Sequence, residues 1–291
     1  MEIYRFRLLS DFKEVQDFLK KNYDTSHLNS YYLPHFFEYA MTHPMFSHAH
    51  AHRMMVIKDN DQIIGFVGYE MTLGDAFLVV DPQHRELLPK MLKLAETEIS
   101  VTDNLQKVCR IWVIDHEKEK IKTIVDHGYS LIYEETVTIF DYQQPFIEKL
   151  LPKGYTIQSL KQENDLAKID ACLWKGFNHE GEPDGDLDGR LIMQSGPSFS
   201  TSLTTVIKAH NGEYACYAGM WFDEVNRYAY LEPLATAPDH RKRGLATIAL
   251  MEAMKKTKAL GALYCFGGDL PFYYALGFKK IATRQLYERR W

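Results

Sequence analysis

The feature that most constrains this chain is an internal repeat. A short apolar strand, a Pro-x-His-Arg motif and an amphipathic helix occur in residues 77–95 and again in residues 234–254. Arg85 matches Arg241, which sets the two copies 241 − 85 = 156 residues apart. A second matching piece follows each motif, around Gly128 and Gly277. Because a unit of about 145 residues has the size of a domain rather than of a solenoid repeat, the chain is expected to fold as two related domains.

The length and composition agree with this division. A chain of 291 residues suggests about two domains, and 46% hydrophobic with 25% charged residues is enough to form a packed core. The segment YQQPFIEKLLPKGY (142–155) contains two prolines and a glycine and is the expected linker. We therefore predict one domain over residues 1–145 and another over residues 151–291.

Hydrophobic periodicity predicts mixed α/β structure in both halves. Strands come first as hairpins and then alternate with helices, and Asn211-Gly212 is the strongest hairpin signal. That order predicts a mixed, mostly antiparallel sheet flanked by helices, an α+β arrangement. The expected helices are 10–22, 34–42, 85–98, 117–127, 162–176, 243–260 and 270–276. The expected strands are 52–58, 62–71, 76–81, 108–114, 130–140, 203–209, 213–222, 227–236, 262–266 and 279–288.

Charge and cysteine usage exclude several classes. The net charge is 34 − 39 = −5, which argues against a nucleic-acid binder. Residues 1–150 carry net −7 and residues 151–291 net +2, so an anion site is expected in the second half. No apolar run approaches the length of a membrane helix or signal peptide, and no two cysteines form a CxxC pair. These features favour a cytoplasmic protein with reduced thiols, no membrane partner and no structural zinc.

The two copies of the repeat differ where the motif helix begins. The second copy has the basic run Arg241-Lys242-Arg243 followed by Gly244, whereas the first copy has Leu88 and Pro89 there. The unpaired amides and the dipole of a helix N-terminus bind anions when the backbone is accessible. Glycine permits that approach, and leucine with proline removes it. The second copy is therefore predicted to hold a phosphate group, although a solvated basic turn is the alternative.

The strand before this helix carries a proline, Pro233. A proline within a strand fits only an edge or a bulge. The strand is therefore expected to separate from a neighbour and to offer free backbone groups to an extended, amide-containing ligand.

Residues 227–278 resemble the GNAT superfamily of N-acetyltransferases. Arg241-x-x-Gly244-x-Ala246 resembles its acetyl-CoA signature, and Phe272-Tyr273-x-x-Leu276-Gly277-Phe278 resembles its late tyrosine motif. The resemblance implies two tandem GNAT-like domains, of which the first is degenerate. It also implies that acetyl-CoA binds along the strand and at the helix start. The residues implied for this are Leu234, Ala235, Thr236, Arg241, Lys242, Arg243, Gly244, Leu245, Ala246 and Thr247.

The resemblance further implies that Tyr273 protonates the leaving thiolate, with Tyr274 as the alternative. A primary amine must lose a proton to attack, and Glu232 is the one carboxylate between Asn226 and Asp239. Glu232 is therefore a candidate base, or an anchor for the cationic amine. Alternatively, Tyr273 is an aromatic residue of the core and Glu232 a carboxylate on the surface, and neither takes part in catalysis.

Three other groups of residues are candidates for a functional or a structural role. The acidic segment 178–188 could attract a cationic acceptor or be a solvated loop, and it departs from the EF-hand pattern. His48, His50 and His52 would share one face if extended, but no cysteine completes a zinc set. His240 has a counterpart, His84, in the copy without the anion site, which favours a structural role.

We therefore expect an acetyl-CoA-dependent N-acetyltransferase that uses direct attack on the thioester and no metal. Its acceptor is expected to be a small-molecule amine. The alternatives are a non-catalytic acyl-CoA-binding module and transfer of a longer acyl chain. The acceptor and the oligomeric state are not specified by the sequence.

Overall fold

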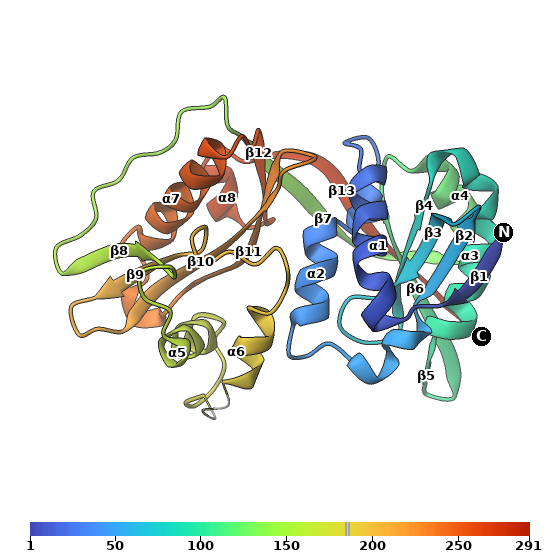
Figure 1. Ribbon diagram of the computed structural model, residues 1–291, viewed down its shortest axis with the longest axis horizontal. Coiled ribbons are helices and arrows are strands. Elements are labelled where there is room, and N and C mark those ends of the chain that lie inside the picture. Colours follow the sequence, from blue (N-terminus) through green and yellow to red (C-terminus); the bar gives the residue numbers. More distant parts are fainter. Residues whose placement is uncertain (184, 186) are drawn as a thin grey trace. The chain divides into compact units, whose positions relative to one another are not determined.

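The computed structural model describes residues 1–183, 185 and 187–291, which form two compact units (Figure 1). The first unit contains Met1–Val137 and Lys280–Trp291, and the second contains Thr138–Lys279. Asp184 and Asp186 of the acidic segment lie outside the described residues.

The first unit is built on a sheet with the strand order β1-β2-β3-β4-β6-β13. All neighbours are antiparallel except β4 and β6, which are parallel, and β5 pairs with β6. The strands are β1 (Glu2–Arg5), β2 (Met55–Asp59), β3 (Gln62–Gly68), β4 (Asp75–Val80), β5 (Val101–Asp103), β6 (Gln106–Ile114) and β13 (Lys279–Arg290). The helices are α1 (Leu8–Asn22), α2 (Pro34–Thr42), α3 (Leu88–Leu94) and α4 (Lys118–Asp126), with 3-10 turns η1 (Leu28–Tyr31), η2 (His48–Arg53) and η3 (Pro82–Leu87) and a π turn η4 (Ala95–Ile99).

The second unit has the strand order β7-β12-β11-β10-β9-β8, and β11 with β12 is its parallel pair. The strands are β7 (Ser130–Asp141), whose last four residues belong to this unit, β8 (Tyr155–Ser159), β9 (Thr205–Ala209), β10 (Tyr214–Asp223), β11 (Tyr228–Thr236) and β12 (Tyr264–Gly267). The helices are α5 (Leu166–Gly176), α6 (Asp188–Met193), α7 (Leu245–Ala259) and α8 (Pro271–Ala275), with the 3-10 turn η5 (Pro238–His240).

In the second unit, helices cover both faces of the sheet (Figure 1). The long helix α7 buries its Leu250 and Met254 in one core together with Cys216 and Ala218 of β10. On the opposite face, α5 buries Ile169 and Leu173 in a second core with Tyr217. The side chains of β10 thus alternate between two apolar layers, as expected for a strand buried on both faces.

The final strands of the two repeat copies are exchanged. β13 follows Gly277 in the second copy, yet it pairs with β6 of the first unit, Leu286 lying opposite Trp112. The end of β7 follows Gly128 in the first copy, yet it pairs with β12 of the second unit, Phe140 lying opposite Cys265. Each unit therefore depends on a strand from the other half of the sequence.

The predicted fold class is confirmed: each unit is a mixed sheet with mostly antiparallel pairs and flanking helices. The expected hairpin turn at Asn211-Gly212 is also confirmed, with Gly212 in the left-handed region. β1, β5, β8 and α6 were not predicted.

Two expected elements were wrong. The helix expected at 85–98 is divided into a 3-10 turn, α3 and a π turn, because Pro89 has no amide hydrogen and sits only in the first turn of α3. The histidines 48–52 are not extended. They fold as the 3-10 turn η2, which delays the next strand to Met55.

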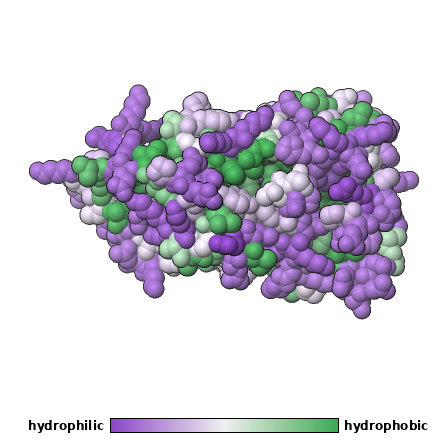
Figure 2. Space-filling view, turned by 90° about the horizontal axis from the view of Figure 1, so that it is seen from above, coloured by the Kyte–Doolittle hydropathy of each residue, from purple (hydrophilic) through white to green (hydrophobic). Residues whose placement is uncertain are grey.

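No helix among residues 1–183, 185 and 187–291 is long and apolar enough to span a membrane. Figure 2 shows a largely hydrophilic face in which apolar side chains form separate patches.

Candidate active site

The parallel strands β11 and β12 separate in the middle of β11. They pair only from Tyr228 to Tyr230, opposite Tyr264 to Phe266, although β11 continues to Thr236. Beyond Tyr230, the side of β11 that faces away from β10 has no strand partner among the described residues. Backbone N–H and C=O groups on such an edge are free to pair with an extended ligand.

A β-bulge marks the separation. Between Ala218 and Met220 of β10, the register on β11 moves from Leu234 to Leu231, so β11 carries one extra residue. Glu232 and Pro233 occupy the bulge, as expected from a proline within a strand. The Trp221 indole Nε1–H donates to the Glu232 carbonyl at 3.2 Å, which fixes the backbone there. The separation from a neighbouring strand that Pro233 led us to expect is therefore present, and Pro233 lies in a bulge.

The open edge of β11 leads directly to the N-terminus of α7. Gly244 is the N-cap, with φ of 78° in the left-handed region, and its carbonyl accepts the Ile248 amide at 3.1 Å. The amides of Leu245, Ala246 and Thr247 precede Ile248, the first amide that donates a hydrogen bond within the helix, and so have no helical partner. Together with the helix dipole they make this tip a candidate anion site. The predicted strand residues thus lie at the end of β11, and the predicted helix-tip residues follow η5 at the start of α7.

The basic side chains beside this tip do not all face the same way. The Arg241 guanidinium donates to the carbonyls of Thr236 (3.0 Å) and Gly176 (2.8 Å), so it ties the loop to the ends of β11 and α5. Arg243 reaches the Asp239 carbonyl at 3.5 Å. Lys242 has a left-handed backbone, with φ of 60°. Arg241 therefore holds the anion loop in shape, a contact that the sequence did not indicate.

Tyr273 lies on the short helix α8, in the element that follows β12. Its ring packs edge-on against Phe272 and Phe278, with centroids 5.2 and 5.3 Å away. Burial, followed by the negative charge of Glu232, raises the pKa of Tyr273 above its usual value. Its hydroxyl has no hydrogen-bond partner within the described part of the chain. Tyr273 is therefore a protonated, uncommitted donor close enough to Glu232 to sense its charge.

The alternative tyrosine is placed differently. Tyr274 is 42% exposed, and its hydroxyl donates to Asp269 Oδ1 at 2.7 Å. This proton is already committed to a carboxylate, which makes Tyr274 the poorer donor.

Residues 167–278 match the family model described as the acetyltransferase (GNAT) family. The chain carries a GNAT domain in its second unit. The resemblance predicted from the two motifs is therefore confirmed for this domain, and membership of this family implies acyl transfer from acyl-CoA. No curated protein matches the chain.

Solved structures resemble the whole chain at low identity. A tandem GNAT protein from the clavulanic acid biosynthesis pathway aligns with a TM-score of 0.62 and 12% identity, covering 99% of this chain and 98% of its own. A GNAT-family acetyltransferase from Colwellia psychrerythraea aligns with a TM-score of 0.60 and 15% identity, covering 99% of both chains. A GCN5-related N-acetyltransferase from Sphaerobacter thermophilus aligns with a TM-score of 0.59 and 13% identity, covering 81% of this chain and 80% of its own. At such identities the likeness concerns the fold, and it supports the tandem GNAT layout.

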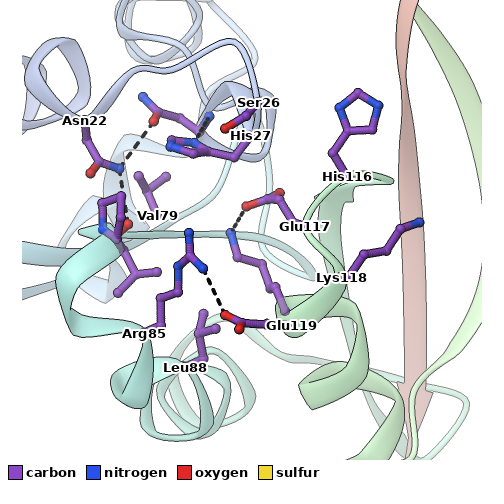
Figure 3. A pocket seen from close by; sticks show the side chains of 14 residues that line it. Asn22, Ser26, His27, Val79, Arg85, Leu88, His116, Glu117, Lys118 and Glu119 are labelled. Atoms are coloured by element: carbon purple, nitrogen blue, oxygen red, sulfur yellow. Dashed lines mark hydrogen bonds and ion pairs between the residues drawn. The ribbon is translucent and has the colours of Figure 1, made fainter.

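The first unit repeats the strand separation of the GNAT domain. β4 and β6 pair in parallel only from Asp75 to Phe77, opposite Arg110 to Trp112, and β4 then continues to Val80. A pocket of about 430 Å³ opens at this point (Figure 3).

Lys120 occupies the separation in the first unit. Its Nζ donates to the Leu78 carbonyl at 2.7 Å and to Ser30 Oγ at 2.6 Å, and it lies 2.5 Å from Glu117 Oε1. Leu78 is the first residue of β4 beyond the paired stretch, so the lysine takes a backbone acceptor that an extended ligand would need. The side chain is 6% exposed and therefore a fixed part of the unit.

The helix tip of the first unit is also changed. Leu88, the counterpart of Gly244, is right-handed (φ −51°), buried and lines the pocket. Arg85, the counterpart of Arg241, pairs with Glu119 at 3.0 Å (Figure 3). The structure thus contains one open and one obstructed version of the same arrangement.

The remaining candidates lie apart from this chemistry. His240 is buried between the Tyr155 hydroxyl (2.8 Å) and Glu213 Oε1 (2.6 Å), which supports its structural role. In η2, His48 Nε2 contacts the Met41 carbonyl and His50 Nδ1 contacts Ser47 Oγ. No group of three His, Cys, Asp or Glu side chains suited to a metal occurs among residues 1–183, 185 and 187–291.

Proposed function

We propose that the chain is an acetyl-CoA-dependent N-acetyltransferase that transfers an acetyl group to a primary amine. The observation that carries this is the continuous path from the open edge of β11 to the amides at the tip of α7. An extended, amide-containing arm ending in a diphosphate matches both parts of that path. Acetyl-CoA has this constitution, and here it is a substrate that supplies the thioester.

Leu234, Ala235 and Thr236 would pair with the pantetheine amides, and the amides from Lys242 to Thr247 would hold the diphosphate. The Arg241 amide, implied for the same role, already donates to the Pro238 carbonyl at 3.1 Å. In this arrangement the thioester lies toward the bulge, in the neighbourhood of Glu232 and Tyr273. The GNAT family supports the acyl donor, while the choice of acetyl over a longer acyl group belongs to the proposal.

The reaction proceeds by direct attack. An alkylammonium group of pKa about 10.4 is mostly protonated at pH 7, so Glu232, directly or through water, accepts one of its protons. The amine nitrogen forms a bond to the thioester carbon and becomes positively charged, and it then loses its second proton to the solvent. The carbon–sulfur bond breaks as the tetrahedral intermediate collapses. Tyr273 donates its phenolic proton to the departing thiolate, and the phenolate recovers a proton from the solvent. The products are the acetamide and free coenzyme A.

Residues 1–145 are the degenerate copy and residues 151–291 the coenzyme-binding copy of the repeat. Lys120 and Leu88 in the first copy support this division, because Lys120 occupies the Leu78 carbonyl and Leu88 replaces the glycine at the helix tip. The four cysteines are free and buried, which suits a reducing compartment, and we place the enzyme in the cytoplasm.

The acceptor is proposed to be a small cationic amine. The described acidic residues near α5 and α6 include Glu180, Glu182 and Asp188, and Lys175 pairs with Glu182 at 3.2 Å. Residues 178–188 contain five acidic residues and no Lys or Arg, and this net negative charge favours a cationic acceptor.

A thiol-release assay with acetyl-CoA tests the proposal. The panel contains polyamines, amino sugars, amino acids and a peptide with a free N-terminus. Glu232→Gln should bind acetyl-CoA as the wild type does while lowering turnover at neutral pH. Binding of acetyl-CoA without thiol release from any amine would instead identify a non-catalytic acyl-CoA-binding module.

A further inference from the structure

A lysine from the segment between the two repeat copies lies on the anion site of the GNAT domain. Beside Gly244, the position that a Cβ atom would occupy is 3.3 Å from Lys149 Cδ and 3.7 Å from Lys149 Nζ. The ammonium group therefore lies on the face of Gly244 that the absence of a side chain leaves open. The same absence is what lets a phosphate approach the backbone.

The position of Lys149 is fixed by its neighbours in the segment. Ile147 and Leu151, two residues away on either side, pack against the core that contains Leu250 and Met254 of α7. Ile147, Lys149 and Leu151 also line one groove with Ile248 of α7. Lys149 is thus an exposed side chain on a backbone that is held along the helix.

The ammonium group of Lys149 is available to a ligand. Its ammonium has no hydrogen bond or ion pair with any described residue. Arg241, by contrast, commits its guanidinium to two backbone carbonyls. The helix tip supplies amide donors, so the full charge of Lys149 beside it would complement a diphosphate.

We infer that Lys149 binds the diphosphate of the acyl-CoA substrate. This rests on the proposed function, because it assigns a further binding residue to the same site. The segment that joins the two copies is then part of the substrate site rather than a connection alone.

Titration calorimetry with acetyl-CoA tests the inference. Lys149→Ala should weaken binding about tenfold, the scale of one charge-assisted hydrogen bond at an exposed site. Lys149→Glu should weaken it further, and Lys149→Arg should recover most of the affinity. Loss of one phosphate contact should also make the affinity of Lys149→Ala less sensitive to salt than that of the wild type.

Lys153→Ala is the matched control, since Lys153 is an exposed lysine of the same segment without a described partner. It should bind acetyl-CoA as the wild type does. If the wild type binds and Lys149→Ala binds equally well, the inference is overturned and the proposed function stands. If the wild type itself does not bind acetyl-CoA, the proposed function fails as well.

Discussion

The carbonyl oxygen of Glu232 lies 2.2 Å from the point that a Cβ atom on Gly219 would occupy. The Glu232 carbonyl carbon is 2.9 Å from that point, so backbone and not a flexible side chain fills the space. Residue 219 must therefore be glycine for the bulge in β11 to keep its present shape. The bulge in turn sets where β11 leaves β12 and where the Glu232 side chain begins.

Gly219→Ala should displace the bulge. The methyl group cannot be accommodated beside the Glu232 carbonyl, and overpacking of this kind costs about 1–3 kcal/mol. We expect a lower melting temperature and weaker acetyl-CoA binding, measured by calorimetry at a temperature where the variant is folded. A folded variant with wild-type affinity would show that the bulge does not shape the substrate site.

Tyr273→Phe should lower turnover without changing acetyl-CoA affinity. A general acid contributes about a hundredfold or more to the rate, and the ring packing against Phe272 and Phe278 is retained. The measurement is kcat in the thiol-release assay together with the Kd for acetyl-CoA. Tyr274→Phe is the matched control and should leave kcat near the wild-type value, because its hydroxyl is bonded to Asp269. Equal loss in both variants would contradict the assignment of Tyr273.

Glu163 should make the second unit more stable above about pH 4.5 than below it. Hydrogen bonds from Lys168 first, then Lys208 and Gln158, lower the pKa of Glu163 from 4.5 to about 2. A carboxylate whose pKa is depressed by folding stabilises the folded state above its unfolded pKa. That contribution disappears as the pH falls from about 4.5 to about 2.

Glu163→Gln should therefore melt at a lower temperature than the wild type at pH 7. The difference should shrink as the pH falls below 4.5, in melting curves followed by circular dichroism. A difference that stays constant down to pH 2 would mean that the lost packing, and not the charge, is responsible.

Lys120→Met should destabilise the first unit. It removes the partner of Glu117, whose side chain is 9% exposed, and an uncompensated buried charge costs about 3–5 kcal/mol. The double variant Lys120→Met/Glu117→Gln should recover part of the loss, and thermal denaturation measures both. A single variant as stable as the wild type would show that the ion pair is dispensable for the unit.

The repeat and the hydrophobic patterns predicted most of the fold because they depend on local periodicity. α1, α2 and the hairpin of β9 and β10 follow directly from such patterns. The short strands β1, β5 and β8 were missed, since three to five residues carry too little pattern to be distinguished from a loop. The exchange of β7 and β13 could not be predicted, because pairing across the sequence leaves no local signal.

The candidate site was predicted unevenly for the same reason. Gly244 has a signal in the sequence, as a glycine at a helix start where its twin has Leu88. Gly219 and Lys149 matter through contacts with residues that are distant in sequence, and neither belongs to a motif. The role of Lys120 could not be predicted from the sequence either, because its three hydrogen-bond acceptors come from three separate segments of the first unit.

The most direct test is calorimetry of acetyl-CoA with the wild type and with Gly244→Leu, which introduces the residue found at position 88. The wild type should bind one acetyl-CoA per chain. Gly244→Leu should lose this binding, because a side chain there is strained at φ of 78° and blocks the amides of the helix tip. Circular dichroism confirms that the variant is folded. Undiminished binding by Gly244→Leu would place the acyl donor elsewhere and contradict the site.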